Sequence, residues 1–134
     1  MEIGVDIVEI SRIRALYERY GAVFMRRLMT EAEISQCLAK HDPVASLAGR
    51  FAAKEAVSKA LGTGISGSLS WRSIEVLNNA AGKPQVTLHL PDAGQLSPFR
   101  ISVSISHDRH SAVATAIVEP GNADLQLGDL MRDE

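Results

Sequence analysis

The chain has 134 residues, enough for one domain with a modest core that an oligomer interface can extend. Apolar residues make up 46% of it and aromatic residues 4%, so Ala, Val, Ile and Leu must build most of the core. A net charge of −2 argues against a nucleic-acid binder, and no apolar run approaches the ~20 residues that span a bilayer. The single cysteine, Cys37, excludes an internal disulfide and fits a reducing compartment, and the N-terminus lacks the basic region of a signal peptide. We therefore expect a cytoplasmic protein.

The chain is predicted to begin with one strand and two helices. Apolar residues alternate with others over residues 3–8, which predicts a strand. Ser11 is placed to cap the next helix, which is expected to stop at Gly21. A short helix is expected over residues 24–28.

Two further helices are predicted after these. Thr30 and Glu33 form a capping-box pattern at the start of the first. Its buried stripe is predicted to consist of Ile34, Cys37 and Leu38. Asp42 and the proline after it form a second start signal, and the Ala-rich helix that follows is expected to end at Gly62.

The second half of the chain changes to turns and strands. Alternating apolar residues predict strands around 74–76, 86–90, 99–105 and 113–118. Because an N-terminal strand and helices precede these strands, the expected class is α+β with an antiparallel sheet.

Asp6 stands in the middle of the apolar first strand. A carboxylate there is costly unless it is paired or bound to a metal. A salt bridge, or an edge position facing water, is the ordinary alternative, and the strand by itself leaves these readings open.

Glu55 and Lys59 belong to the densest group of chemically capable residues, the segment 50–59. They are four residues apart and share a helix face, so an ordinary ion pair worth about 0.2–0.5 kcal/mol is one interpretation. Asp6 and Glu55 together could instead hold one Mg²⁺. This ion often takes one or two carboxylates and completes its shell with water and substrate phosphates.

His107 ends a predicted strand, where it could meet a phosphate or a base ring. The alternative is a turn histidine that is hydrogen-bonded to Asp108. No spacing that indicates a metal cluster is found among His41, His89 and His110. Cys37 lies on an apolar helix stripe and is predicted to belong to the core rather than to act as a nucleophile.

Four stretches carry a resemblance to a known family. They are GVDIVEISRI at 4–13, AGRFAAKEAVSKALGTGI at 48–65, AGKPQVTL at 81–88 and SVSISHD at 102–108. In sequence, order and spacing they resemble the holo-acyl-carrier-protein synthase family of phosphopantetheinyl transferases. The similarity covers residues 1–118, the expected transferase domain, and leaves 119–134 as an acidic C-terminal tail.

The resemblance implies a binding site for coenzyme A and a metal. It implies that Asp6 and Glu55 bind Mg²⁺ and that Lys59 lies beside the pyrophosphate. Arg50 and His107 are implied to hold the 3'-phosphate end of the nucleotide, near the turn at 82–84. The residues implied to bind coenzyme A are Arg50, Lys59, Gly62, Gly64, Lys83, Pro84 and His107.

The resemblance also implies partners. Relatives are typically trimers with three active sites at the subunit interfaces, and their first helix receives the acyl carrier protein. Arg50 and Glu55 lie about 140° apart around a helix. We therefore expect Arg50 and His107 to come from one subunit and the carboxylates with Lys59 to come from its neighbour. The expected carrier contacts are Arg12, Arg14, Leu16 and Arg27.

The implied reaction moves 4'-phosphopantetheine from coenzyme A to a serine of apo acyl carrier protein and releases 3',5'-ADP, as in fatty acid biosynthesis. Lys59 and Mg²⁺ would neutralise the attacked phosphate and the leaving group, and Glu55 would accept the serine proton. The alternatives are a catalytically inactive coenzyme A-binding module and a structural trimer without a ligand. The presence of both carboxylates and Lys59 favours the enzyme.

The sequence also contains two oppositely charged segments and one departure from the family pattern. Residues 12–27 carry a net charge of +4, which can steer an acidic carrier, and residues 119–134 carry −4. The tail is expected either to be a solvated end or to compete weakly with the carrier. Relatives often have a basic pair shortly before Arg50, whereas Lys40 is the nearby candidate here.

Overall fold

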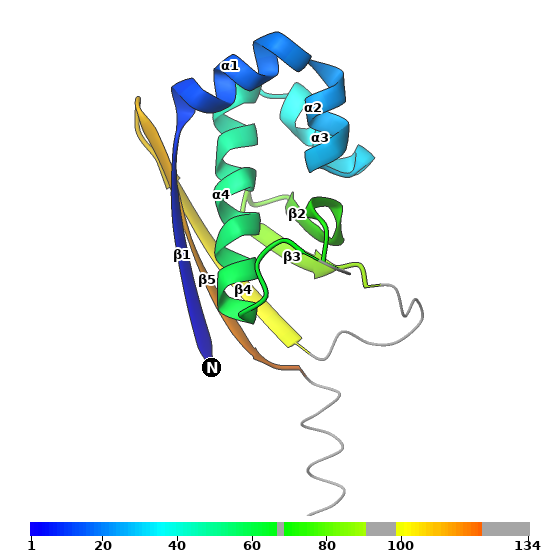
Figure 1. The fold of residues 1–134 in the computed structure, drawn as a ribbon, viewed down its shortest axis with the longest axis vertical. Coiled ribbons are helices and arrows are strands. Elements are labelled where there is room, and N and C mark those ends of the chain that lie inside the picture. The colour runs from blue at the N-terminus through cyan, green and yellow to red at the C-terminus, as the bar shows by residue number, and fades with distance from the viewer. Residues whose placement is uncertain (67–68, 91–98, 122–134) are drawn as a thin grey trace, which may run out of the picture.

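A central helix, α4 (Pro43–Leu61), organises the fold. The computed structural model describes residues 1–66, 69–90 and 99–121, so the tail lies outside the described residues except at its first three positions. A three-stranded sheet covers one side of α4, and shorter helices and a hairpin cover the other (Figure 1). Most of α4 is therefore buried, which explains why its sequence is Ala-rich rather than clearly amphipathic.

The three-stranded sheet is antiparallel and joins the two ends of the chain. Its strands are β1 (Glu2–Glu9), β4 (Phe99–His107) and β5 (Ser111–Pro120). β5 lies in the centre, between β1 and β4, so β1 is an edge strand. The strands predicted over 3–8, 99–105 and 113–118 are confirmed, each with slightly wider bounds.

Gly4 allows β1 to approach α4 closely. A Cβ atom at this position would lie 2.0 Å from the carbonyl oxygen of Ala56 and 2.9 Å from the backbone nitrogen of Ala60. Alternate residues of a strand share a face, so Asp6 also points to the α4 side. The opposite face of β1 leaves three apolar side chains exposed, those of Ile3, Val5 and Ile7.

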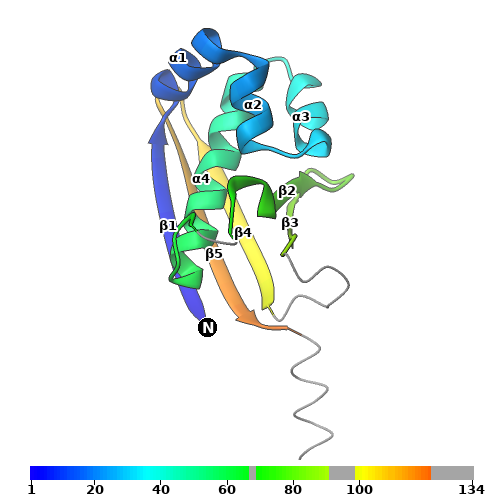
Figure 2. The ribbon, with the colours of Figure 1, turned by 45° about the vertical axis from the view of Figure 1, so that its right-hand side comes forward.

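Three short helices pack at the N-terminal end of α4 (Figure 2). They are α1 (Ile10–Tyr20), α2 (Ala22–Leu28) and α3 (Glu31–Leu38). The expectation that Ser11 caps α1 is wrong, because the helix follows β1 directly, with Glu9 as its N-cap residue and no side-chain cap. The stop at Gly21 is confirmed, and the positive φ of 53° there suits glycine.

The helices α3 and α4 begin as predicted. The capping box of Thr30 and Glu33 is present, and Asp42 caps α4 through a 3.1 Å hydrogen bond from the backbone N–H of Val44. Cys37 is fully buried, as expected, but Leu38 is 54% exposed, so its place in the buried stripe was wrong. Leu38 is the last residue of α3.

A separate two-stranded hairpin packs on α3 and α4. The short helix η1 (Trp71–Ser73) leads into β2 (Ile74–Asn78), which pairs with β3 (Pro84–Leu88). The strands form two antiparallel sheets, where the sequence led us to expect one. The α+β class is confirmed, with α4 between the three-stranded sheet and the hairpin.

Candidate functional site

Asp6 and Lys59 meet where β1 crosses α4. The Lys59 ammonium donates to the Asp6 carboxylate at 2.9 Å and to the carbonyl oxygen of Val5 at 3.1 Å. The side chain of Asp6 is 15% exposed and that of Lys59 is 52% exposed, so solvent reaches the pair from one side. Of the alternatives left open for Asp6, the structure contains the salt bridge.

Glu55 lies one helical turn before Lys59 and interacts with both members of this pair. Burial raises the pKa of Glu55, the negative charge of Asp6 raises it further, and Lys59 opposes the increase. The negative charge of Asp6 therefore acts on Glu55, as expected for two carboxylates arranged around one cation site. We name Asp6, Glu55 and Lys59 the carboxylate cluster.

The carboxylate cluster fits a magnesium ion that a phosphate ligand completes. Its oxygen donors are of the kind that Mg²⁺ prefers, and two carboxylates are typical of sites where substrate supplies further oxygens. Among the described residues, no group of three or more His, Cys, Asp or Glu side chains forms a closed metal site. The two carboxylates therefore suit a metal site that a substrate completes, rather than a structural metal site formed by protein ligands alone.

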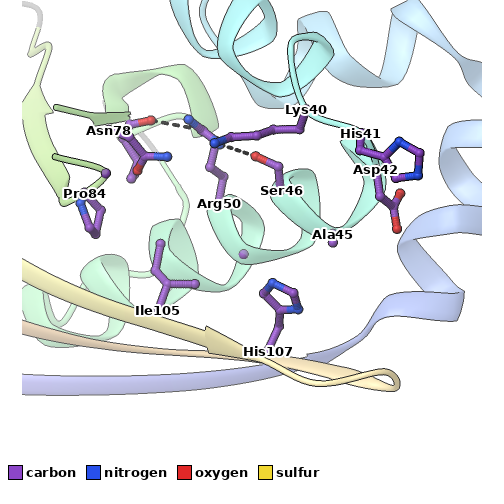
Figure 3. A pocket seen from close by; sticks show the side chains of 13 residues that line it. Lys40, His41, Asp42, Ala45, Ser46, Arg50, Asn78, Pro84, Ile105 and His107 are labelled. Carbon is purple, nitrogen blue, oxygen red and sulfur yellow. Dashed lines mark hydrogen bonds between the residues drawn. The ribbon is translucent and has the colours of Figure 1, made fainter. Parts of the chain in front are cut away.

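A cavity of about 490 Å³ lies on the other side of α4. Its walls come from α4, from the hairpin and from β4, as Figure 3 shows for Arg50, Pro84 and His107. Lys40 and His41, in the turn before α4, also line it. Two cationic residues, Lys40 and Arg50, and two histidines thus outnumber the one carboxylate among the described lining residues, that of Asp42, which suits an anionic ligand.

Arg50 is held firmly within the protein. Its side chain donates through Nε to the carbonyl oxygen of Val76 at 3.0 Å, and through Nη2 to Oε1 of Gln36 at 2.7 Å. Nη1 donates to Ser46 and to Cys37. Arg50 is only 3% exposed, so it contributes a fixed positive charge to the cavity wall rather than a mobile side chain.

Three residues predicted to bind coenzyme A have structural roles in the described part of the chain. Gly62 ends α4 in the left-handed conformation, and Gly64 donates its N–H to Ser58. The backbone N–H of Lys83 donates to Asn79 in the hairpin turn. None of the three is among the described residues that line the cavity, whereas Pro84 and Gly82 are.

His107 reaches the cavity from the end of β4. Asp108 next to it accepts hydrogen bonds from the backbone N–H groups of His110 and Ser111, both at 2.8 Å. These bonds, more than any other influence, lower the pKa of Asp108. The Asp108 side chain thus stabilises the turn between β4 and β5 through backbone hydrogen bonds. The alternative that we considered was a hydrogen bond between Asp108 and His107.

The expected carrier contacts lie on α1 and α2 and are only partly brought together. Leu16 and Arg27 line an open groove of about 490 Å³ that also includes Tyr20, Val23 and Phe24. Arg12 is exposed on α1. Arg14 forms a 3.2 Å ion pair with Asp42, so its charge is already partly neutralised.

Sequence reasoning missed the polar side chains behind the cavity. Lys54 is fully buried and forms a 2.8 Å ion pair with Glu33, and burial lowers its pKa although Glu33 opposes the shift. Gln36 lies one turn after Glu33 on the same face of α3. The i, i+3 spacing of Glu33 and Gln36 was the one sequence feature that could have indicated these residues, because it places two polar side chains on one face of a helix that must pack against α4.

In the described part of the chain, no helix is long and apolar enough to cross a membrane.

Comparisons with known proteins match almost the whole chain. A family model described as the 4'-phosphopantetheinyl transferase superfamily matches residues 2–117. A holo-[acyl-carrier-protein] synthase of Chlorobaculum parvum is 69% identical over 120 residues, which cover 90% of this chain and 99% of that protein. A solved structure of a holo-(acyl-carrier-protein) synthase from Bacillus anthracis, in complex with CoA (3',5'-ADP), is 37% identical with a TM-score of 0.77. The match covers 90% of this chain and 96% of that one.

A second solved structure agrees with the first. The holo-[acyl-carrier-protein] synthase from Helicobacter pylori, in complex with coenzyme A, is 36% identical with a TM-score of 0.75. The match covers 87% of this chain and 99% of that one.

Proposed function

The chain belongs to the 4'-phosphopantetheinyl transferase superfamily, and we propose that it is a magnesium-dependent enzyme that moves 4'-phosphopantetheine from coenzyme A to a serine of apo acyl carrier protein. The observation that carries the proposal is the carboxylate cluster, in which two carboxylates and an ammonium meet at the crossing of β1 and α4. Relatives with this activity in their names match nearly the whole chain.

The reaction joins the serine oxygen to the β-phosphorus of coenzyme A and breaks the bond to the bridging oxygen of the pyrophosphate. The products are the phosphopantetheinyl serine and 3',5'-ADP. Lys59, half exposed at the surface of the cluster, places a positive charge beside the pyrophosphate. Glu55, whose pKa is raised by burial and by Asp6, is suited to accept the serine proton.

Asp6 and Glu55 are the residues that would hold Mg²⁺. The ion would supply positive charge to the phosphate oxygens and orient them for displacement. Lys59 already donates a hydrogen bond to the Asp6 carboxylate, and this contact holds the Asp6 side chain against α4.

We propose that the nucleotide end of coenzyme A binds in the cavity lined by Arg50 and His107. Arg50, His107 and Lys40 there provide the positive and hydrogen-bonding groups that a 3'-phosphate requires. Relatives often have a basic pair shortly before Arg50, and this chain has only Lys40 as a nearby candidate for that contact. Pro84 and Gly82 would face the adenosine, and we retain Gly62, Gly64 and Lys83 as weaker candidates because the backbone contacts of these three residues stabilise local turns.

We further propose that the active enzyme is a homotrimer. The outer face of β1 exposes Ile3, Val5 and Ile7 by 62%, 56% and 68%. An apolar strip of this kind on a regular sheet marks an interaction surface. The cavity and the carboxylate cluster share no described residue, so one coenzyme A molecule would contact two subunits whose sheet faces pack together.

The carrier protein is expected to dock on α1 and α2. Acyl carrier proteins are acidic around the modified serine, and residues 12–27 carry +4. The groove between Leu16 and Arg27 adds apolar area next to these charges. Of the two α1 arginines expected to contact the carrier, Arg12 and Arg14, only Arg14 is paired with Asp42.

A role in fatty acid biosynthesis in the cytoplasm follows from this proposal. The substrate chemistry requires a carrier protein and coenzyme A in one compartment. Cys37, which is free and fully buried, is compatible with a reducing environment.

The deciding experiment mixes the protein with coenzyme A, Mg²⁺ and an apo acyl carrier protein and measures the mass of the carrier. We expect the carrier to gain one 4'-phosphopantetheine group, and to gain none when the metal is chelated. A carrier of unchanged mass in the complete mixture would contradict the proposed function. Binding of coenzyme A without transfer would instead support the inactive binding module.

A further inference from the structure

The outer edge of strand β2 is paired with side chains instead of another strand. On its inner edge, β2 pairs with β3 from Ile74 to Asn78. On the outer edge, Lys54 donates to the carbonyl oxygen of Ile74, and Glu33 accepts from the N–H of Val76 at 3.0 Å. Helices α3 and α4 thus supply the hydrogen bonds that a further strand would make.

At the end of this edge, Gln36 makes two hydrogen bonds to the backbone of Asn78 and accepts a third from Arg50. Its Oε1 accepts from the backbone N–H of Asn78 at 2.9 Å, and its Nε2 donates to the carbonyl oxygen of Asn78 at 3.0 Å. The same Oε1 accepts from Nη2 of Arg50 at 2.7 Å. The opposite orientation of the amide would set its NH₂ group against two donors, so the network fixes this one.

Arg50 and Asn78, the two partners of Gln36, both line the cavity. Gln36 is not among the described residues that form the cavity wall. Gln36 therefore lies behind the cavity wall and joins two parts of it, Arg50 on α4 and Asn78 at the end of β2.

Asn78 is the last residue of β2 and leads directly into the turn of the hairpin. The next residue, Asn79, accepts from Ala81 and from Lys83 through its side chain, each at 3.0 Å. Its backbone carbonyl also accepts from Gly82 at 2.9 Å. This rigid turn leads directly to Gly82 and Pro84, which line the cavity, so the place of Asn78 determines where that wall lies.

We propose that Gln36 is a positioning residue for the coenzyme A donor. Together with the direct hydrogen bond from Arg50 to Val76, it sets the distance between Arg50 and the hairpin turn, and it thereby affects donor affinity without touching the donor. This inference rests on the proposed function in one respect, namely that the cavity receives the nucleotide.

The test compares Gln36→Met with wild type and with Gln85→Met. Methionine keeps the length of the side chain but loses the three hydrogen bonds. Gln85 is an exposed glutamine on β3, so its replacement controls for a general effect of the change. KM for coenzyme A, KM for the carrier and kcat are measured for all three proteins. Hydrogen exchange of the Asn78 amide is followed in the same proteins and in Gln36→Glu, which keeps the acceptor.

We expect Gln36→Met to raise KM for coenzyme A about tenfold, the order expected when the hydrogen bonds of a residue behind a site are lost. We expect kcat and the carrier KM to stay within about twofold, because the carboxylate cluster and α1 are not connected to Gln36. The Asn78 amide should exchange faster in Gln36→Met and regain protection in Gln36→Glu. Gln85→Met should behave as wild type.

Two results would overturn the inference. One is an unchanged KM for coenzyme A in Gln36→Met. The other is a parallel loss in all three kinetic constants, or a variant that does not fold, since either would make Gln36 a folding residue only. If wild type itself does not modify the carrier, the proposed function fails, whereas normal transfer with an unchanged KM refutes the role of Gln36 alone.

Discussion

The ammonium of Lys59 lies 2.9 Å from the carboxylate of Asp6, so the helix that carries Glu55 also supplies the partner that holds Asp6 in place. This contact depends on Gly4, which permits β1 to touch the backbone of α4. The ion pair itself is partly exposed and contributes little to stability, about 0–1 kcal/mol. Its main consequence is the placement of two carboxylates beside one cation.

The first prediction concerns the carboxylates. Asp6→Ala and Glu55→Ala should each reduce transfer by about 100-fold or more, because each removes a charged ligand of the proposed ion. Circular dichroism should show a folded protein in both cases. Glu2→Ala, which removes an exposed carboxylate from the same strand, is the control and should keep full activity. Near-normal transfer by Asp6→Ala, with magnesium still required, would refute the assignment.

The second prediction concerns the pKa of Glu55 in the metal-free protein. Its raised pKa means that the folded state keeps a proton that the unfolded state, with a pKa of 4.5, has lost. Stability should therefore fall as the pH rises from about 4.5 through the folded pKa. Asp6→Asn should lower the pKa of Glu55 and reduce this fall, since it removes a negative neighbour and leaves Lys59. Carboxyl NMR titration measures the shift, and an unchanged or higher pKa in Asp6→Asn would contradict it.

The third prediction concerns sites shared between subunits. Asp6→Ala and His107→Ala should each be nearly inactive alone. Mixed trimers from equal amounts should recover up to about a quarter of wild-type activity, because that fraction of randomly formed interfaces carries both intact residues. The subunits are mixed under dissociating conditions, and each variant treated alone is the control. No recovery in verified mixed trimers would indicate a site within one chain.

The fourth prediction concerns the carrier surface. Arg27→Glu should raise the carrier KM about tenfold and weaken its dependence on salt, because exposed charges mainly steer association and are screened. The KM for coenzyme A should not change. Arg72→Glu, an exposed arginine on η1, is the matched control. If both reversals raise the carrier KM equally, the effect reflects overall charge and the docking surface lies elsewhere.

The fifth prediction concerns the start of α4. Burial alone would raise the pKa of Asp42, but hydrogen bonds from Val44 and Arg14 outweigh it and leave the pKa below 3.8. Asp42→Ala should lower the free energy of unfolding by about 1 kcal/mol through loss of the N-cap. Asp42→Asn keeps an acceptor oxygen and should lose less.

The pH dependence separates the charge of Asp42 from its capping role. Because the pKa of Asp42 is lower in the folded state than in the unfolded state, the ionised carboxylate stabilises the protein at pH values above the unfolded pKa. This stabilisation is lost as the pH falls through the folded pKa. The wild-type advantage over Asp42→Asn should therefore be present at neutral pH, decline below the unfolded value of 3.8 and disappear as the pH falls through the folded pKa. Thermal unfolding at several pH values measures it, and a difference that persists at low pH would show that the charge is not responsible.

The sequence by itself determined the elements that local chemistry specifies. Three such features depend only on neighbours within four residues, and the structure contains each of them: the capping box at Thr30, the start of α4 at Asp42 and the end of α4 at Gly62. The α+β class followed from the order of helical and alternating patterns. The ligand types of the carboxylate cluster were also visible, because carboxylates within apolar or Ala-rich segments are costly without a partner.

Only the tertiary structure decided which residues meet across the chain. Asp6 is 53 residues from Lys59, and the close approach at Gly4 that joins them cannot be derived from local spacing. Gln36 and Asn78 are 42 residues apart, and neither has a pattern that indicates the other. The outer edge of β2 is completed by side chains because no strand covers it within the described chain, and that depends on how α3 and α4 pack. Local propensity fixes helices and caps, whereas contacts between distant segments arise from packing and backbone hydrogen-bond satisfaction, which involve the whole fold.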